Sequence, residues 1–219
     1  MRSLVRTRMT LMPPAWLPLA AILAVIVVSA LRLLSVQLSH GVKAYGFGRH
    51  ADIQRVAERN WRIAVAATIA FAAIAWLKPD LELALGRPDW AGTGLLRWLA
   101  SGLFVACFLV IAIAQVQMGK SWRIGVPKEG PGDLIAHGIF RWSRNPIFVG
   151  MIGTLVALFL WSPHIGTAGV LAATWTLVLI QVRIEEEALI EKHGAAYQEY
   201  SAQVARWFGW PRRKSAKAC

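Results

Sequence analysis

The sequence predicts an all-α polytopic membrane protein with about five transmembrane helices and an amphipathic helix near its C-terminus. Two observations support this fold class. Of the 219 residues, 56% are hydrophobic and 16% are charged, and the mean hydropathy is +0.47, whereas soluble domains are about 25% charged. Five apolar runs follow one another along the chain, as expected for helices that cross a bilayer. We find no internal repeat or linker and treat residues 1–219 as a single membrane domain.

The five runs cover residues 13–38, 61–77, 95–118, 146–161 and 165–182. Arg32 interrupts the first run near its end, where a long side chain can reach the polar interface. Trp61 and Trp76 lie at the two ends of the second, as interfacial anchors do. The fourth run is short. The Ser162-Pro163-His164 turn joins it to the fifth, so these two runs are expected to form a helical hairpin.

Three segments outside the runs carry further expectations. Residues 52–59 are predicted to form a short interfacial helix, and residues 78–94 a mixed-charge loop. Residues 188–207 are predicted to form the amphipathic helix, because apolar and aromatic side chains recur there every three or four residues. These side chains are Leu189, His193, Tyr197 and Tyr200.

The net charge of +12 raises the question of a nucleic-acid partner. The cations flank the apolar runs and do not form a separate basic domain, so an orientation signal is the better interpretation and no nucleic acid is expected. With five spans, 17 Lys and Arg fall on one side of the bilayer and six on the other. The 17-rich side is therefore predicted to be cytoplasmic. Two cysteines are too few for a disulfide framework.

The stretch from His137 to Gly150 is a basic, aromatic interruption before the fourth run. Arg141 and Arg144 precede Pro146, which suits the first position of a helix. A helix start with nearby cations favours an anion or a charged cofactor.

Glu185 and Glu186 follow the fifth run. One interpretation is that they merely end a membrane helix in water. The other is that one carboxylate faces the basic loop or a cationic ligand. The second interpretation has a geometric basis, since the start of the fourth run and the end of the fifth must meet in an antiparallel hairpin.

Several common catalytic motifs are absent from the sequence. It contains no Walker A sequence, no G-x-G-x-x-G and no G-x-S-x-G. His137 and His193 lack the companion ligands of a metal site, so no metal is expected.

Residues 105–207 resemble the isoprenylcysteine carboxyl methyltransferase and phospholipid methyltransferase superfamily of integral membrane enzymes. The resemblance rests on motifs in a fixed order. These are Gly119-Lys120-Ser121-Trp122-Arg123, His137-Gly138-Ile139-Phe140-Arg141, Arg144-Asn145-Pro146-Ile147-Phe148-Val149-Gly150, Glu185-Glu186, and Leu189, Gly194, Tyr197 and Tyr200.

The resemblance implies methyl transfer from S-adenosylmethionine to a small lipophilic acceptor that enters from the lipid bilayer. It implies catalytic roles for Arg144, Asn145 and Glu186. It further implies a cofactor pocket lined by His137, Gly138, Ile139, Phe140, Arg144, Pro146, Phe148 and Gly150, with Glu185 and Glu186 on polar groups of the cofactor and Tyr197 and Tyr200 helping to close it. We expect an integral protein of a bacterial inner membrane, with its active site facing the cytoplasm.

Four positions depart from the family pattern. Asn145 stands where most members have histidine, and it cannot carry a proton as a cation. Phe140 and Phe148 stand where tyrosine is common, and His193 where phenylalanine is usual. These departures leave the acceptor open.

Two other functions remain open at this stage, as does the oligomeric state. Sterol-reductase-type membrane enzymes share a similar C-terminal block and use NADPH. A non-catalytic membrane relative is the other alternative, and Asn145 is its best support. The short chain and the E-E-x-x-L segment favour the methyltransferase.

Overall fold

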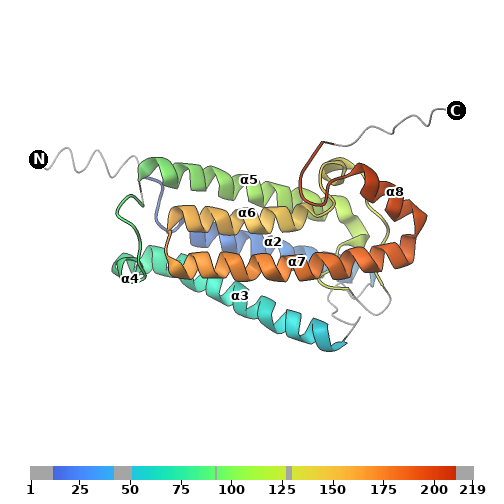
Figure 1. The fold of residues 1–219 in the computed structure, drawn as a ribbon, viewed down its shortest axis with the longest axis horizontal. Helices are drawn as coiled ribbons and strands as arrows, with labels where there is room; N and C mark the ends of the chain where they lie inside the picture. The colour runs from blue at the N-terminus through green and yellow to red at the C-terminus, as the bar shows by residue number, and fades with distance from the viewer. Residues whose placement is uncertain (1–11, 42–50, 92, 127–129, 211–219) are drawn as a thin grey trace, which may run out of the picture.

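The described residues form a bundle of helices that lie side by side (Figure 1). The structure is a computed structural model that describes residues 12–41, 51–91, 93–126 and 130–210. Its elements are α2 (Leu17–His40), α3 (Ala51–Leu77), α4 (Pro79–Ala84), α5 (Gly94–Met118), η1 (Gly119–Ser121), η2 (Gly138–Arg141), α6 (Pro146–Trp161), α7 (Ile165–His193) and α8 (Ala195–Gln203). Four helices are long and apolar enough to cross a membrane, and α6 is a shorter apolar helix. The predicted all-α polytopic membrane fold is confirmed.

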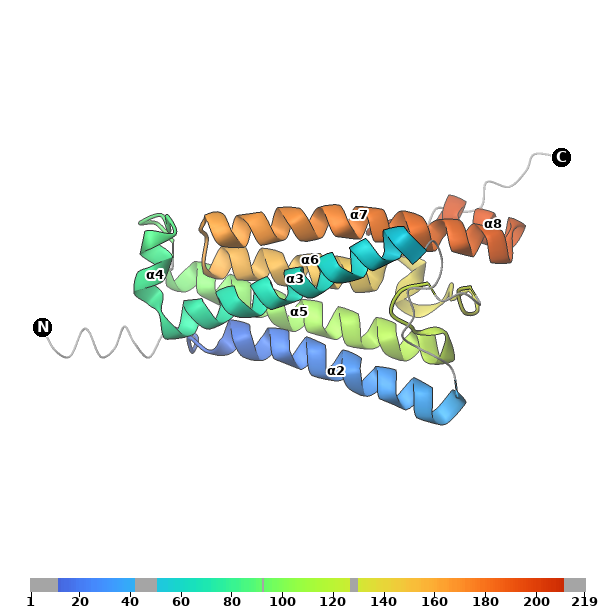
Figure 2. The same ribbon diagram turned by 90° about the horizontal axis from the view of Figure 1, so that it is seen from below.

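Successive long helices run in alternating directions (Figure 2). The α5–α6 connection, the C-terminal end of α2 and helix α8 therefore lie at one end of the bundle, which we call the α8 end. Helix α4 and the α6–α7 turn lie at the opposite end. This alternation brings the basic loop before α6 to the same end as the glutamates late in α7.

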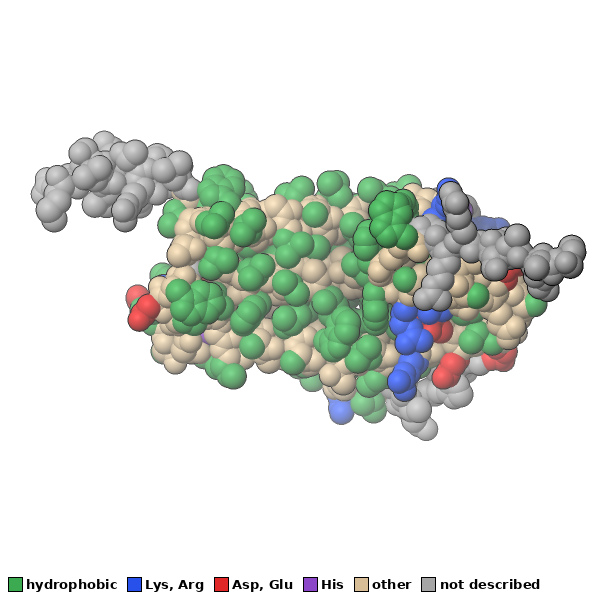
Figure 3. All heavy atoms as spheres, turned by 45° about the horizontal axis from the view of Figure 1, so that its top comes forward, with side chains coloured by type: hydrophobic (Ala, Val, Ile, Leu, Met, Phe, Trp, Pro, Cys, Tyr) green, Lys and Arg blue, Asp and Glu red, His purple; other side chains and the backbone are tan. Residues whose placement is uncertain are grey.

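The surface of the bundle is apolar along its length and charged at the α8 end (Figure 3). Large side chains such as Leu31, Val105, Leu109, Val116 and Ile180 are exposed to the surroundings. In a soluble protein such a surface would aggregate, whereas in a bilayer it contacts lipid tails. Lys43, Arg49 and the basic residues after Trp210 lie outside the described residues.

Helices α5 and α6 pack closely through glycine. A Cβ atom added at Gly150 would lie 2.5 Å from Cγ1 of Ile111 and 3.1 Å from the carbonyl oxygen of Cys107. One added at Gly153 would clash with the Cys107 sulfur. Small residues at a membrane helix interface let the backbones approach, and van der Waals contact then holds the helices together. The same packing places the start of α6 against the end of α5.

The α6–α7 turn is fixed by its own polar groups and by α4. His164 caps α7, because its Nδ1 accepts hydrogen bonds from the backbone N–H groups of Gly166 at 3.1 Å and Thr167 at 3.3 Å. The buried Glu82 carboxylate of α4 accepts a hydrogen bond from the Ser162 hydroxyl and pairs with Arg87 at 2.7 Å. The predicted hairpin is confirmed, and its turn packs against a helix that the sequence did not predict.

Three expectations about the connecting segments are wrong. Residues 52–59 are not a separate interfacial helix, since α3 runs without a break from Ala51 to Leu77. The predicted loop 78–94 contains α4. Residues 188–207 are not one helix. Helix α7 continues to His193, the backbone leaves the helical conformation at Gly194, where φ is +51°, and α8 then runs only to Gln203. The charged residues after Val182 did not end α7, because a helix leaving the bilayer can continue into water.

The Gly150 contact leads to a first prediction. Gly150→Ala should destabilise the protein by about 1–3 kcal/mol, because the new methyl group overpacks the α5–α6 interface. The measurement is the free energy of unfolding in mixed detergent micelles.

Gly102→Ala is the matched control, since Gly102 is likewise inside a long apolar helix, α5, and a Cβ atom there would have no neighbour within 4 Å. Equal effects of the two substitutions would contradict the packing role of Gly150.

Candidate functional site

The loop before α6 is anchored to the end of α5 at Gly138. This residue has φ +58°, in the left-handed region that favours glycine. A Cβ atom there would also clash with the Gln117 side chain. The Gln117 Oε1 accepts a hydrogen bond from the backbone N–H of Ile139 at 2.8 Å. The conformation of η2 therefore depends on a glycine and on one side chain of α5.

The same loop pairs with the segment 204–210 that follows α8. The backbone N–H of Arg144 donates to the carbonyl of Ala205 at 3.0 Å. The Asn145 side-chain Nδ2 donates to the carbonyl of Arg206 at 3.1 Å. The hydroxyl of Tyr200 donates to the carbonyl of Phe140 at 2.7 Å. Together these bonds join the loop, α8 and the C-terminal segment into one wall.

The Glu186 carboxylate lies between two guanidinium groups. Arg206 binds it in a bidentate manner, with Nε at 3.2 Å from Oε1 and Nη2 at 2.7 Å from Oε2. Arg144 Nη2 lies 3.4 Å from Oε1. Glu186 and Arg144 are largely buried, so water screens this pair little. The Arg206 side chain is 42% exposed, so its pair with Glu186 is screened more. The expectation that the glutamates meet the basic loop is confirmed for Glu186 and Arg144.

Two buried tyrosines lie beside this charge cluster. Burial, followed by the nearby Glu186 carboxylate, raises the pKa of Tyr197 to about 12. Burial and the neighbouring Tyr197 also raise the pKa of Tyr200. The two rings meet edge to face, with centroids 6.0 Å apart. Both hydroxyls therefore remain neutral near pH 7, and the rings form an uncharged aromatic surface next to Glu186.

The site also contains buried polar atoms without partners. Arg144 Nε and Gln181 Oε1 are both buried and make no hydrogen bond. Gln181 uses its Nε2 to bind Glu185 Oε1 at 2.9 Å, so Glu185 does not take part in the pair with the arginines. Buried polar atoms without partners are rare, and a missing ligand is one ordinary reason for them.

The structure distributes the predicted site residues over two zones. One group lies in or against the charge cluster: Phe140, Arg144, Asn145, Glu185, Glu186, Tyr197 and Tyr200. The other group lies away from it. His137 and Gly138 are exposed on the loop, Phe148 stacks on Trp61 at 6.4 Å, and Gly150 packs on α5. Buried Pro146 opens α6 as expected. The cofactor-binding roles assigned to these residues remain predictions.

Arg206 is the residue that sequence reasoning missed. It lies beyond the family motifs, in a segment whose aromatic side chains pack on the loop. Trp142 stacks on Phe208 and meets Trp210, with ring centroids 6.4 and 4.7 Å away. A single cation within an aromatic stretch was the available signal, but its partner is 20 residues away along the chain. Only the fold brings them together.

The Gly119–Arg123 motif has a structural role in this arrangement. The Ser121 hydroxyl accepts a hydrogen bond from the backbone N–H of Asp133 at 3.0 Å. His193 Nε2 lies 2.9 Å from the carbonyl oxygen of Gly132, so the end of α7 is bonded to the same segment. The motif thus helps to hold the segment at residues 132 and 133, which leads into the loop.

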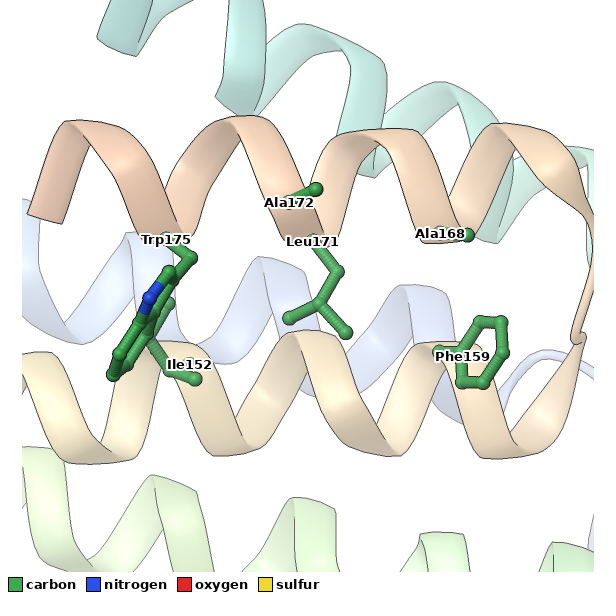
Figure 4. A pocket seen from close by; sticks show the side chains of 6 residues that line it. All are labelled: Ile152, Phe159, Ala168, Leu171, Ala172 and Trp175. Carbon is green, nitrogen blue, oxygen red and sulfur yellow. The ribbon is translucent and has the colours of Figure 1, made fainter.

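A cavity of about 370 Å³ opens between α6 and α7 on the apolar surface (Figure 4). Leu171 and Trp175 point from α7 toward α6, and Ile152 and Phe159 line the α6 side. The Trp175 ring lies 5.2 Å from that of Trp207, the neighbour of Arg206 in the chain. Trp175 therefore connects the lining of the cavity with the segment that carries Arg206.

The fold and the site define an all-α integral membrane protein with a buried glutamate between two arginines, and with two buried tyrosines, at one end of its bundle. Residues 98–191 match the isoprenylcysteine carboxyl methyltransferase family. The match covers less than half of the chain and shows that this part is similar to that family.

Three methyltransferases from different organisms are similar to this chain. A methanethiol S-methyltransferase of Mycobacterium tuberculosis is 31% identical over 140 residues, covering 62% of this chain and 52% of the relative. A protein-S-isoprenylcysteine O-methyltransferase of Saccharomyces cerevisiae is 31% identical over 112 residues, 46% of each chain. Methanethiol S-methyltransferase 1 of Bradyrhizobium diazoefficiens is 26% identical over 137 residues, covering 61% of this chain and 44% of the relative. The matched part is about half the length of each relative.

Asn145 gives a prediction about the wall between loop and C-terminal segment. Asn145→Ala should cost about 0.5–1.5 kcal/mol, because it removes the hydrogen bond to the Arg206 carbonyl. Asn145→Asp should cost more, since an ionised carboxylate places a second acceptor against that carbonyl oxygen. The free energy of unfolding in detergent measures both. An Asp variant as stable as wild type would contradict this role.

Proposed function

We propose that the protein transfers a methyl group from S-adenosylmethionine to a small lipophilic acceptor, with residues 105–207 as the catalytic core. The observation that carries the proposal is the Glu186 carboxylate, bound by Arg144 and Arg206 beside two neutral tyrosines. Arg144 and Glu186 lie inside the segment that matches the family. This arrangement combines the charges and the aromatic surface that a charged amino-acid-like cofactor requires.

The residues fit the chemical groups of this cofactor. Its carboxylate requires a cationic donor, and Arg144 has a buried Nε without a partner. Its amino group requires acceptors, and Gln181 Oε1 and the Glu185 carboxylate lie one helical turn apart on α7. When bound, S-adenosylmethionine supplies a methyl group on a positively charged sulfur, which aromatic faces and carboxylates attract.

The chain's own contribution is positioning and exclusion of water. Methyl transfer is an in-line displacement, so holding both reactants in line accounts for much of the rate. Tyr200 and Asn145 bind the loop to the C-terminal segment through the Phe140 and Arg206 carbonyls. The wall formed in this way covers Glu186, which keeps its interactions strong in a site of low dielectric constant.

A lipophilic acceptor is supported by the cavity between α6 and α7. The cavity opens on the lipid-facing surface, and its Trp175 contacts Trp207 beside Arg206. The named acceptors of the relatives differ, since two are methanethiol enzymes and one is an isoprenylcysteine enzyme. A thiol acceptor must lose a proton before transfer, whereas a carboxylate is already ionised near pH 7.

The relatives described above are methyltransferases, which favours methyl transfer over the reductase alternative. We also propose that the α8 end faces the cytoplasm of a bacterium, with the protein in the inner membrane. The excess of Lys and Arg in the segments that belong to this end supports that orientation.

Binding of labelled S-adenosylmethionine to the detergent-purified protein tests the proposal. Wild type should bind saturably, and Arg144→Ala and Glu186→Ala should each weaken binding at least about tenfold, equivalent to about 1.4 kcal/mol, because each removes a charge from the cluster. The readout is the dissociation constant at equilibrium.

Arg183→Ala and Glu187→Ala are the matched controls, since both residues are exposed on α7 at the same end and should leave the affinity unchanged. Absence of saturable binding, or equal effects of cluster and control variants, would overturn the proposal. Oxidation of NADPH with a lipid acceptor would favour the reductase.

The pH dependence of methyl transfer separates the acceptor classes. With a thiol acceptor the rate should rise about tenfold per pH unit below the pKa of the free thiol, near 8.5 for a cysteine-like group. With a carboxylate acceptor it should be flat above about pH 6. The measurement is initial rate against pH with a matched thiol and carboxylic acid of equal chain length. A thiol rate independent of pH would show that the site itself removes the proton.

A further inference from the structure

A second polar site lies on the other side of the bundle, between α2 and α5. A cavity of about 270 Å³ there is lined by Val28, Leu31, Arg32 and Ser35 of α2 and by residues of α5 that include Gln115 and Val116. Leu31 and Val116 are 61% and 69% exposed. The cavity therefore opens on the surface that faces lipid tails, although polar groups lie inside it.

Gln115 supplies a buried acceptor without a partner. Its side-chain Nε2 donates to the Ser29 hydroxyl of α2 at 2.7 Å. Its Oε1 is buried and accepts no hydrogen bond, and the residue as a whole is 2% exposed. The amide is fixed between two helices, so its free oxygen is held at the cavity and requires a donor from outside the described residues.

Arg32 supplies a cation that has no counter-ion among the described residues. It lies within the candidate span Leu17–Ser39, its Nε is buried without a partner, and no ion pair with a described carboxylate satisfies its charge. An arginine in a membrane helix normally pairs with an anion or reaches the interface, because an isolated charge in hydrocarbon is costly. The cavity therefore combines a cation and a free acceptor.

The depth of the cavity suits a lipid headgroup. Gln115 lies three residues before the end of α5 at Met118, which is about 4.5 Å of helix. Two residues later, Gln117 binds the loop at the α8 end. Arg32 lies eight residues, or about 12 Å, before the end of α2, a distance that a long side chain can partly bridge toward the interface.

We propose that this cavity binds one phospholipid whose headgroup carries a phosphate with net negative charge and a hydroxyl donor, as phosphatidylglycerol does. The phosphate pairs with the Arg32 guanidinium, a headgroup hydroxyl donates to Gln115 Oε1, and an acyl chain lies along Leu31 and Val116. A lipid is the source of the phosphate because the cavity opens among exposed apolar side chains. This site is separate from the Glu186 cluster, and its occupancy does not require methyl transfer.

The test uses the full-length protein, stripped of lipid in detergent and titrated with single lipids. Native mass spectrometry counts bound lipid, and the thermal unfolding midpoint reports its effect. Phosphatidylglycerol should bind at least tenfold more tightly than phosphatidylmethanol, which has the same charge but no headgroup donor, and more tightly than zwitterionic phosphatidylcholine. Glycerol phosphate without acyl chains should not bind.

Two variants locate the site. Arg32→Gln should weaken phosphatidylglycerol binding at least tenfold, whereas Arg183→Gln, an exposed arginine of α7 at the same end, should not. Gln115→Leu should remove the preference for phosphatidylglycerol over phosphatidylmethanol. Equal binding of the three lipids by wild type, or equal effects of the two arginine variants, would overturn the proposal. The comparison of lipids on wild type remains decisive even where a variant fails to fold.

Discussion

The Glu186 carboxylate is the interaction on which the described site depends. Arg144 reaches it from the loop before α6, and Arg206 reaches it from the segment after α8. Removing Glu186 would leave the largely buried Arg144 guanidinium without its carboxylate partner, which is more costly than the intact cluster. Three segments far apart in the sequence are therefore joined through a single side chain of α7.

The two ends of the bundle use buried polar groups in different ways. At the α4 end, Glu82 is satisfied by Arg87 and the Ser162 hydroxyl and packs against a tight turn. At the α8 end, Glu186 is bound, but Arg144 Nε and Gln181 Oε1 nearby have no partner. Arg87 Nε and His164 Nε2 at the α4 end are also buried without a partner, so such atoms alone do not distinguish the two ends. The α8 end differs because its charge cluster joins the loop before α6, helix α7 and the segment after α8.

Three glycines determine how closely α6 and the loop before it approach α5. Gly150 and Gly153 bring α6 against Cys107 and Ile111 of α5, and Gly138 lets the loop pass over Gln117. The conformation of the loop and the packing of the helices that carry it thus depend on α5. The cavity beside Arg32 is formed partly by the same helix, so lipid on one side and the loop on the other contact a common element.

Hydropathy and turn residues alone determined the class of fold, the ends of α6, the α6–α7 hairpin and the proximity of the basic loop to the glutamates, because antiparallel spans of similar length leave few alternatives. The order of motifs indicated the family. Tertiary structure decided the rest. Three features depend on contacts between residues far apart in the chain. They are the pairing of Arg206 with Glu186, the division of residues 188–207 into two helices and a segment without helix, and the packing of α4 against Ser162. A local pattern carries no information on such contacts, because the partner of each group is chosen by packing and not by spacing.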